Sequence, residues 1–243
     1  MKSLFLFFIS SFLFFASLNA QDIMDYKEFY MGAGYNVSYG EFSELNYILD
    51  KYNDLGVNTK DFKELHIPNG FALALGTNLA FLNFEFGVAT KKQRRLANYI
   101  VGDDLYARDV RLNMTSYSLG MGLFTPISRG IGLGIGASYE LGNVKVQTKK
   151  ALNSELGSKD YLDIVKDKTK GITLDFKFQI GDTEENGSKI LIKPYYTLSF
   201  SSDTDLSPLD ATINEGSMPD NTNLNQNFSH FGVRIIVTYS VIR

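Results

Sequence analysis

Charged side chains recur inside segments that are otherwise apolar, and they carry the most evident chemistry of this 243-residue chain. A buried charge needs a partner, because an isolated one costs several kcal/mol. Five such residues fall at a similar distance from one end of their segments: Glu85, Asp175, Lys177, Lys193 and Arg234. We expect them to form a network of salt bridges on one side of their segments.

A second candidate pair is Arg111 with Glu140, which we expect on neighbouring segments and nearer the opposite end. Glu28 joins the same inward set, in which acidic and basic members are equal in number. Balanced, paired charges are typical of a structural plug. The functional alternative is a narrow or gated path for ions.

Histidine is scarce, which limits the prospects for catalysis. His230 shares strand parity with Arg234, and a simple hairpin would place Ser199 opposite His230, with Asp203 nearby. Ser, His and an acid are the residues of nucleophilic hydrolysis. Because these side chains face the same closed side as the charged network, we favour an ordinary hydrogen bond and predict that the protein is not an enzyme.

A basic run and an acidic cluster lie in polar stretches. The basic run consists of Lys91, Lys92, Arg94 and Arg95. It could bind anionic phosphate groups, although such runs are more often simply solvated. The acidic cluster around Asp203 lacks the spacing of a calcium-binding loop, so we predict neither a metal nor another cofactor.

Segments with two-residue periodicity must position these side chains. Successive residues of an extended strand point to opposite faces, and each segment alternates apolar residues with small or polar ones. The eight segments are residues 27–39, 70–78, 81–91, 110–124, 129–142, 169–181, 189–201 and 228–241. In 129–142 the non-apolar face is nearly bare, and glycines such as Gly134 are expected to leave room for long charged side chains.

The connections between these segments alternate in length. Three are short turns, at residues 79–80, 125–128 and 182–188. Four are long and polar, at residues 40–69, 92–109, 143–168 and 202–227. The long connections therefore lie at one end of the sheet, while the short turns and both termini lie at the other. This asymmetry is typical of membrane barrels with periplasmic turns and extracellular loops.

The first long connection contains one amphipathic segment, residues 43–54. Its apolar residues recur at helical spacing: Leu45, Ile48, Leu49 and Tyr52. Ser43 is a candidate N-cap and Gly56 a candidate stop. We expect a short helix folded over the mouth of the barrel, either packed on its rim or, as the alternative, acting as a ligand-binding lid.

The first twenty residues have the pattern of a secretory signal peptide. Lys2 supplies a positive start, residues 4–15 are mostly apolar, and small residues precede a cleavage site that we place after Ala20. The apolar run is too short for a membrane anchor. Residues 21–243 are then expected to form a single domain.

Composition narrows the class of protein further. The chain has no Cys, which excludes a disulfide framework, and its formal net charge of -3 argues against nucleic-acid binding. After the signal segment no apolar run reaches the length of a membrane helix.

With this signal segment, strand alternation and loop pattern, residues 27–243 resemble the small eight-stranded outer-membrane barrels of Gram-negative bacteria. These are the OmpA and OmpX type and their porin-family relatives. Members commonly end in an aromatic residue that the barrel-assembly machinery recognises. This chain ends in Arg243, so Tyr239 is its candidate for that signal.

We therefore predict an all-β fold, an eight-stranded antiparallel up-and-down transmembrane β-barrel with short periplasmic turns and four long extracellular loops. Eight strands enclose an interior just wide enough for side chains, so the lumen should be plugged. The expected role is structural or surface interaction in the outer membrane, with lipid, lipopolysaccharide, the assembly machinery and an extracellular ligand at the loops as partners. A closed barrel is a monomer by default.

Three alternatives remain open at this point. The first is a narrow porin-like channel for ions or small solutes, and the second is a lipid-modifying outer-membrane enzyme. The third is a soluble, lipocalin-like barrel.

Overall fold

The computed structural model describes residues 26–55, 58–128, 130–152, 161–181, 186–201, 203–214 and 223–242. The predicted signal segment 1–20 and its cleavage site after Ala20 lie outside these residues. The predicted helix stop at Gly56 and most of the short turn 182–188 also lie outside them.

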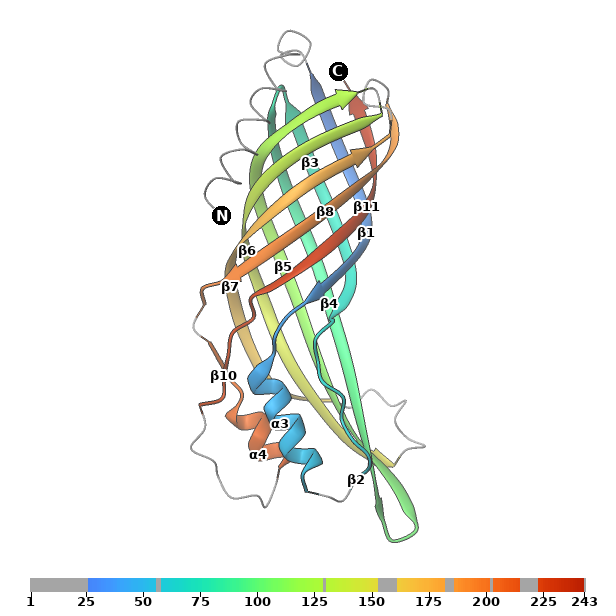
Figure 1. Ribbon diagram of the computed structural model, residues 1–243, viewed down its shortest axis with the longest axis vertical. Helices are drawn as coiled ribbons and strands as arrows, with labels where there is room; N and C mark the ends of the chain where they lie inside the picture. Colours follow the sequence, from blue (N-terminus) through green and yellow to red (C-terminus); the bar gives the residue numbers. More distant parts are fainter. Residues whose placement is uncertain are drawn as a thin grey trace.

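Eight strands form one closed antiparallel ring (Figure 1). They are β1 (Lys27–Tyr39), β3 (Asn69–Leu79), β4 (Leu82–Val101), β5 (Asp104–Ser128), β6 (Ile131–Leu152), β7 (Leu162–Ile180), β8 (Gly187–Ser199) and β11 (His230–Ile242). Each pairs with its neighbour in this order, and β11 closes the ring by pairing with β1. The prediction of an eight-stranded up-and-down barrel is confirmed.

Small elements occupy two of the connections. The first holds α3 (Ser43–Asn53) and β2 (Asn58–Lys60), and the last holds β9 (Thr204–Asp205), α4 (Ser207–Ile213) and β10 (Asn225–Gln226). Figure 1 shows both helices at the end of the barrel opposite the first residue of β1 and the last residue of β11. No helix among the described residues is long and apolar enough to cross a membrane.

The strands differ greatly in length, and this corrects one expectation. Residues 92–109 are not a polar loop, because β4 and β5 continue in register from Lys92 opposite Asn113 to Val101 opposite Asp104. Likewise β6 and β7 extend far into the stretch 143–168 that was expected to be a loop. Four strands thus stand well beyond the other four (Figure 1).

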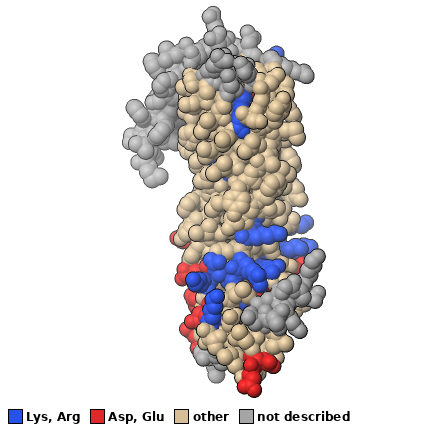
Figure 2. Space-filling model, turned by 90° about the vertical axis from the view of Figure 1, so that its right-hand side faces the viewer, with Lys and Arg blue, Asp and Glu red and all other residues tan. Residues whose placement is uncertain are grey.

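The outer face of the ring is apolar over a wide band. Side chains such as Leu119 (71% exposed) and Met121 (66% exposed) lie fully open on this surface. Figure 2 shows that the band is nearly free of acidic and basic side chains on the face in view. A continuous apolar surface of this size is unfavourable in water, so the band faces lipid. A soluble lipocalin-like barrel would need the opposite arrangement, with its apolar residues inside.

Beyond this band the two faces of the long strands exchange character. In β6 the outward residues are apolar as far as Leu141 and then polar at Asn143, Lys145 and Gln147. The inward residues are small or polar as far as Gly142, and then Val144 and Val146 are fully buried. In β5 the inward residues beyond Ser116 are likewise apolar: Met114, Leu112 and Val110. The strands therefore leave the lipid at this level. Beyond it they enclose an apolar core and expose a polar outer face, as in soluble proteins.

The two helices fill that core. Leu45, Ile48 and Leu49 of α3 and Leu209 and Ile213 of α4 are buried in one apolar cluster with the inward residues of β5 and β6. We call this part of the molecule the cap; it comprises α3, α4 and the strand residues 92–112, 144–152 and 162–168. The predicted helix is confirmed, and its four apolar residues are all buried.

Polar contacts fix the ends of the helices in the cap. The predicted N-cap at Ser43 is wrong, since Phe42 holds that position and the Ser43 hydroxyl donates to Glu44 at 2.8 Å. In front of α4, Asp205 accepts the backbone N–H of Ser207 at 2.9 Å. Hydrogen bonds from Ser207 hold the pKa of the Asp205 carboxyl below its usual value, which stabilises the start of α4.

Candidate functional site

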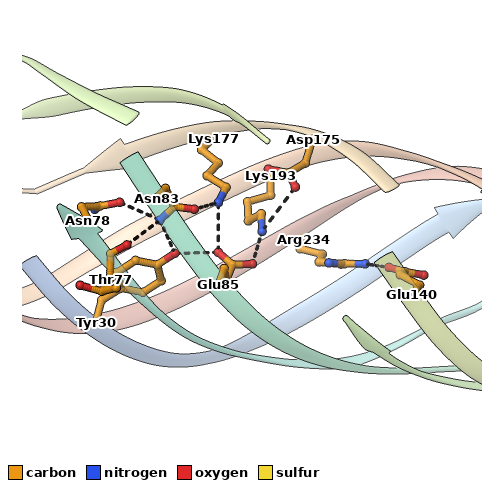
Figure 3. Close-up of polar contacts among 10 residues, drawn as sticks. All are labelled: Tyr30, Thr77, Asn78, Asn83, Glu85, Glu140, Asp175, Lys177, Lys193 and Arg234. Carbon is orange, nitrogen blue, oxygen red and sulfur yellow. Dashed lines mark hydrogen bonds and ion pairs between the residues drawn. The ribbon is translucent and has the colours of Figure 1, made fainter. Parts of the chain in front are cut away.

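Glu85 of β4 lies at the centre of a buried polar network in the lumen (Figure 3). Its carboxylate contacts the Lys193 ammonium of β8 directly, and the Lys177 ammonium of β7 lies 3.5 Å away. Tyr30 of β1 donates its hydroxyl to the same carboxylate at 2.7 Å. Parity places each of these residues inside, and the closed ring brings β1, β7 and β8 together around one carboxylate of β4.

Polar side chains extend this network along the lumen. Asp175 lies 3.8 Å from Lys193, and Asn83 accepts a hydrogen bond from Lys177. Asn83 in turn donates to Asn78 at 2.7 Å. Figure 3 shows the group arranged across the interior from facing strands. Its charged members are at most 8% exposed, so water has little access to them.

Glu28 and Lys189 form a further ion pair near the start of β1 and β8, with 2.7 Å between Glu28 Oε1 and Lys189 Nζ. Asn78 donates to Glu28 Oε2 at 2.5 Å and so joins this pair to the network. Lys189 was not among the residues expected in the network. The available signal was its parity with Lys193, which places both side chains on the inward face of β8. Tyr30 is also absent from the expected network. Its parity with Glu28 is the signal that places it on the inward face of β1.

Glu140 pairs with Arg234 across 2.7 Å (Figure 3). The expectation that Arg111 pairs with Glu140 is therefore wrong. Arg111 has the odd parity of Tyr117, which faces outward, and its guanidinium lies 3.7 Å from Asp109 instead. Parity along β5 was the signal that would have placed Arg111 outside the barrel.

His230 does not belong to a hydrolytic constellation. Thr197, not Ser199, lies opposite His230 in the register of β8 and β11. The Ser199 hydroxyl is 3.1 Å from that of Ser201, while the Nε2 atom of His230 contacts the Lys91 ammonium. The side chains that hydrolysis would require are thus directed to other partners.

Lys91 corrects the interpretation of the basic run as a single surface patch. It is 1% exposed and points into the barrel, because it has the parity of Glu85. Lys92 is exposed, whereas Arg94 Nε donates to Asp109 Oδ2 at 2.7 Å. Arg95 donates to the Glu64 carbonyl at 2.8 Å. The run is therefore divided between the two faces of β4.

Other strands contribute cations at the same level. Outward-facing Lys and Arg residues follow the apolar band in four strands: Lys92 and Arg94 in β4, Arg111 in β5, Lys145 in β6, and Lys166, Lys168 and Lys170 in β7. We call these seven residues the basic belt. Figure 2 shows Lys and Arg side chains gathered in a zone at the end of the apolar band.

The chain is similar to known proteins in structure but not in sequence family. No protein family matches the chain, and no curated protein does. Among solved structures, the chain is similar to Ail, the attachment invasion locus protein of Yersinia pestis, in complex with the heparin analogue sucrose octasulfate. The identity is 13% and the TM-score 0.43, over 90% of this chain and 100% of that one. A second structure of Ail gives 11% identity and a TM-score of 0.42 over the same shares.

The lumen is arranged to hold its own charges. Each carboxylate of the network lies within 4 Å of an ammonium or guanidinium group. Beyond the network, towards α3 and α4, the apolar core of the cap occupies the interior (Figure 1). Within the described ranges, no group of three or more His, Asp or Glu residues could hold a metal ion. The geometry therefore favours a packed interior, with the outer surface and the cap as the parts open to partners.

Proposed function

We propose that the protein is an outer-membrane barrel with a plugged lumen, whose cap serves a structural or surface-interaction role outside the cell. One observation carries the proposal. Ion pairs fill the interior within the apolar band, and an apolar core fills it within the cap. A conducting channel would need lining residues that water reaches, but Lys177 and Lys193 are 4% and 2% exposed.

Planar-bilayer recording tests whether the lumen is plugged. The wild-type protein should give no discrete conductance steps, because the ion pairs around Glu85 and the core of the cap block the path. A narrow channel would instead give steps that change in size in Lys193→Ala. Conductance steps that change in Lys193→Ala would contradict a plugged lumen and show that the barrel is a pore.

The orientation in the membrane can be tested with single cysteines, because the chain has none of its own. Asp103 lies at the exposed β4–β5 turn and Gly130 at the exposed turn between β5 and β6, at opposite ends. We expect Asp103→Cys to react with a membrane-impermeant maleimide on intact cells. Gly130→Cys should react only after the outer membrane is permeabilised. The reverse pattern, or no labelling of either in the envelope, would contradict the proposal.

The basic belt supports lipopolysaccharide as a partner. The belt lies where the apolar band ends, which corresponds to the level of the sugar-phosphate groups in an outer leaflet. Lys and Arg form strong, charge-assisted hydrogen bonds to phosphate. Lys166, Lys168 and Lys170 project from alternate positions of one strand and are all exposed. This proposal leaves out Lys91, which is inside the barrel.

A titration with fluorescent lipopolysaccharide in detergent tests the belt. Replacing Lys166, Lys168 and Lys170 together by Gln should weaken binding by on the order of a hundredfold at low salt, at roughly 1 kcal/mol for each cation. The matched control replaces the exposed Lys27, Lys60 and Lys63, which lie outside the belt, by Gln. Equal loss in both triple variants would show that the binding depends only on net charge.

A further inference from the structure

A small cavity lies where the polar lumen meets the core of the cap. Its volume is about 20 Å³, enough for one water-sized guest. Met114 and Phe228 of the apolar core line one part of it, and Lys91, Glu140 and His230 line another. The cavity is thus lined partly by apolar side chains and partly by ionisable residues, which also include Lys170 of β7.

The charges of the lumen do not balance at this point. Its described acidic residues are Glu28, Glu85, Asp175 and Glu140. Its described basic residues are Lys91, Lys177, Lys189, Lys193 and Arg234. Four of the five cations lie within 4 Å of a carboxylate, so Lys91 is the cation in excess.

His230 does not neutralise Lys91. The Nδ1 atom of His230 lies 2.9 Å from the Phe228 carbonyl, which can only accept, so Nδ1 carries the proton. The Nε2 atom is then free to accept from the Lys91 ammonium. An ammonium has three N–H groups, and His230 is its one hydrogen-bond partner among the described residues.

Glu140 faces the same cavity and attracts the Lys91 ammonium, but its carboxylate is bonded more closely to Arg234, at 2.7 Å. One carboxylate is therefore shared by two cations, and one positive charge remains in excess. The Lys91 ammonium and the Arg234 guanidinium both lie over the Tyr195 ring, at 5.8 and 4.4 Å from its centroid. A buried cation whose counter-charge is bonded mainly to another cation is destabilising.

We propose that the cavity holds one small monovalent anion, of the size of chloride, bound to the ammonium of Lys91. The anion supplies the missing negative charge. It also accepts hydrogen bonds from the N–H groups of Lys91 that do not bind His230. Ser116 and Thr197 also line the cavity and stand on inward positions of β5 and β8. The Thr197 hydroxyl lies 2.6 Å from that of Thr173, so it can accept from Thr173 and donate to the anion. A bound anion would join the lumen network to the cap without a further carboxylate in the sequence. This proposal does not depend on the surface role of the cap.

Thermal unfolding in detergent tests the site, with chloride exchanged for gluconate at constant ionic strength. Gluconate is too large for a cavity of this volume. If chloride is present at about ten times its dissociation constant, the wild-type midpoint should fall by roughly 3 to 6 °C in gluconate. Lys91→Met should lose this dependence, whereas Lys92→Met, on the outward face of the same strand, should keep it.

Crystals of the wild-type protein grown in bromide give a second readout that needs no variant. An anomalous peak within hydrogen-bond distance of Lys91 Nζ is the expected result. The proposal is overturned if no peak appears there, if the wild-type midpoint is the same in both salts, or if Lys91→Met keeps the full wild-type shift. A Lys91→Met protein that does not fold leaves the bromide experiment to decide.

Discussion

At the scale of single residues, the lumen is governed by charge pairing in a dry interior. Glu85 alone contacts two ammonium groups and one phenol, and Lys193 connects it to Asp175. These side chains are too buried for water to replace a lost partner. Each member of the network should therefore matter more for stability than a surface charge of the same type.

Lys193→Met should destabilise the barrel by about 3 to 5 kcal/mol, because it leaves Asp175 with no ammonium within 4 Å and Glu85 with only Lys177. Urea unfolding in lipid vesicles measures the change. Lys27→Met is the matched control, since Lys27 is exposed at the end of β1. Similar midpoints in the two variants would mean that the network adds no stability.

Gly134→Leu should impair folding for a reason of space. A Cβ atom at Gly134 would lie 2.6 Å from the Leu123 carbonyl oxygen and 3.4 Å from Lys177 Cβ. The sequence predicted a clash with the charged cluster, and the structure adds the backbone of β5, which cannot move aside as a flexible side chain can. Ala137→Leu, on the outward face of the same strand, should fold normally. The yield of the heat-resistant form on a gel compares the two.

At the scale of elements, α3 and the long strands depend on one another. The extensions of β5 and β6 present apolar residues inward, and α3 buries Leu45, Ile48 and Leu49 against them. Without the other, the helix or the extended strands would expose these apolar surfaces to water and would not be stable. The cap should therefore open as a unit while the ring in the membrane stays closed.

Leu49→Asp should open the cap, since Leu49 is 1% exposed and a carboxylate there would have no partner in the apolar cluster. The cost should be at least about 3 kcal/mol, judged from the loss of a buried Leu and the burial of a charge. Limited proteolysis should then cut within the cap and leave the membrane-embedded strands intact. Tyr47→Asp, on the exposed side of α3, should stay resistant. Cutting of both variants at the same rate would contradict the buried role of Leu49.

At the scale of the whole molecule, ring closure leaves none of the eight main strands with a free edge in the lipid band. Every neighbouring pair from β1 to β11 is hydrogen-bonded, including the pair that closes the ring. Backbone groups that are all satisfied within the barrel resist detergent, because opening one pair exposes unpaired N–H and C=O groups.

The unboiled protein should therefore migrate differently from the boiled protein in a detergent gel. Boiling separates the strands and gives an extended chain, whereas the closed ring stays compact. Identical mobility before and after boiling would be inconsistent with a stable barrel. The comparison needs no substitution and can precede the other experiments.

Strand parity could be predicted from the sequence because lipid and lumen impose a two-residue period over many residues. That period located all eight strands and the inward position of Glu85, Asp175, Lys177, Lys193 and Arg234. The same period gives Lys91 an inward and Arg111 an outward position, in contrast to the basic surface run and the Arg111–Glu140 pair that we expect from the sequence. The amphipathic pattern of 43–54 located α3 equally well.

Only the tertiary structure decided which charges meet and where the strands end. Arg234 pairs with Glu140 rather than with the Glu85 group because strand stagger sets which residues face each other across the lumen. The sequence pattern does not reveal the extension of β4 to β7, because the apolar face turns inward where the strands leave the lipid. A stretch with a polar outer face then has the pattern of a loop. A sequence gives the period of a strand, whereas the surrounding medium and the opposite wall of the barrel determine what each face contacts.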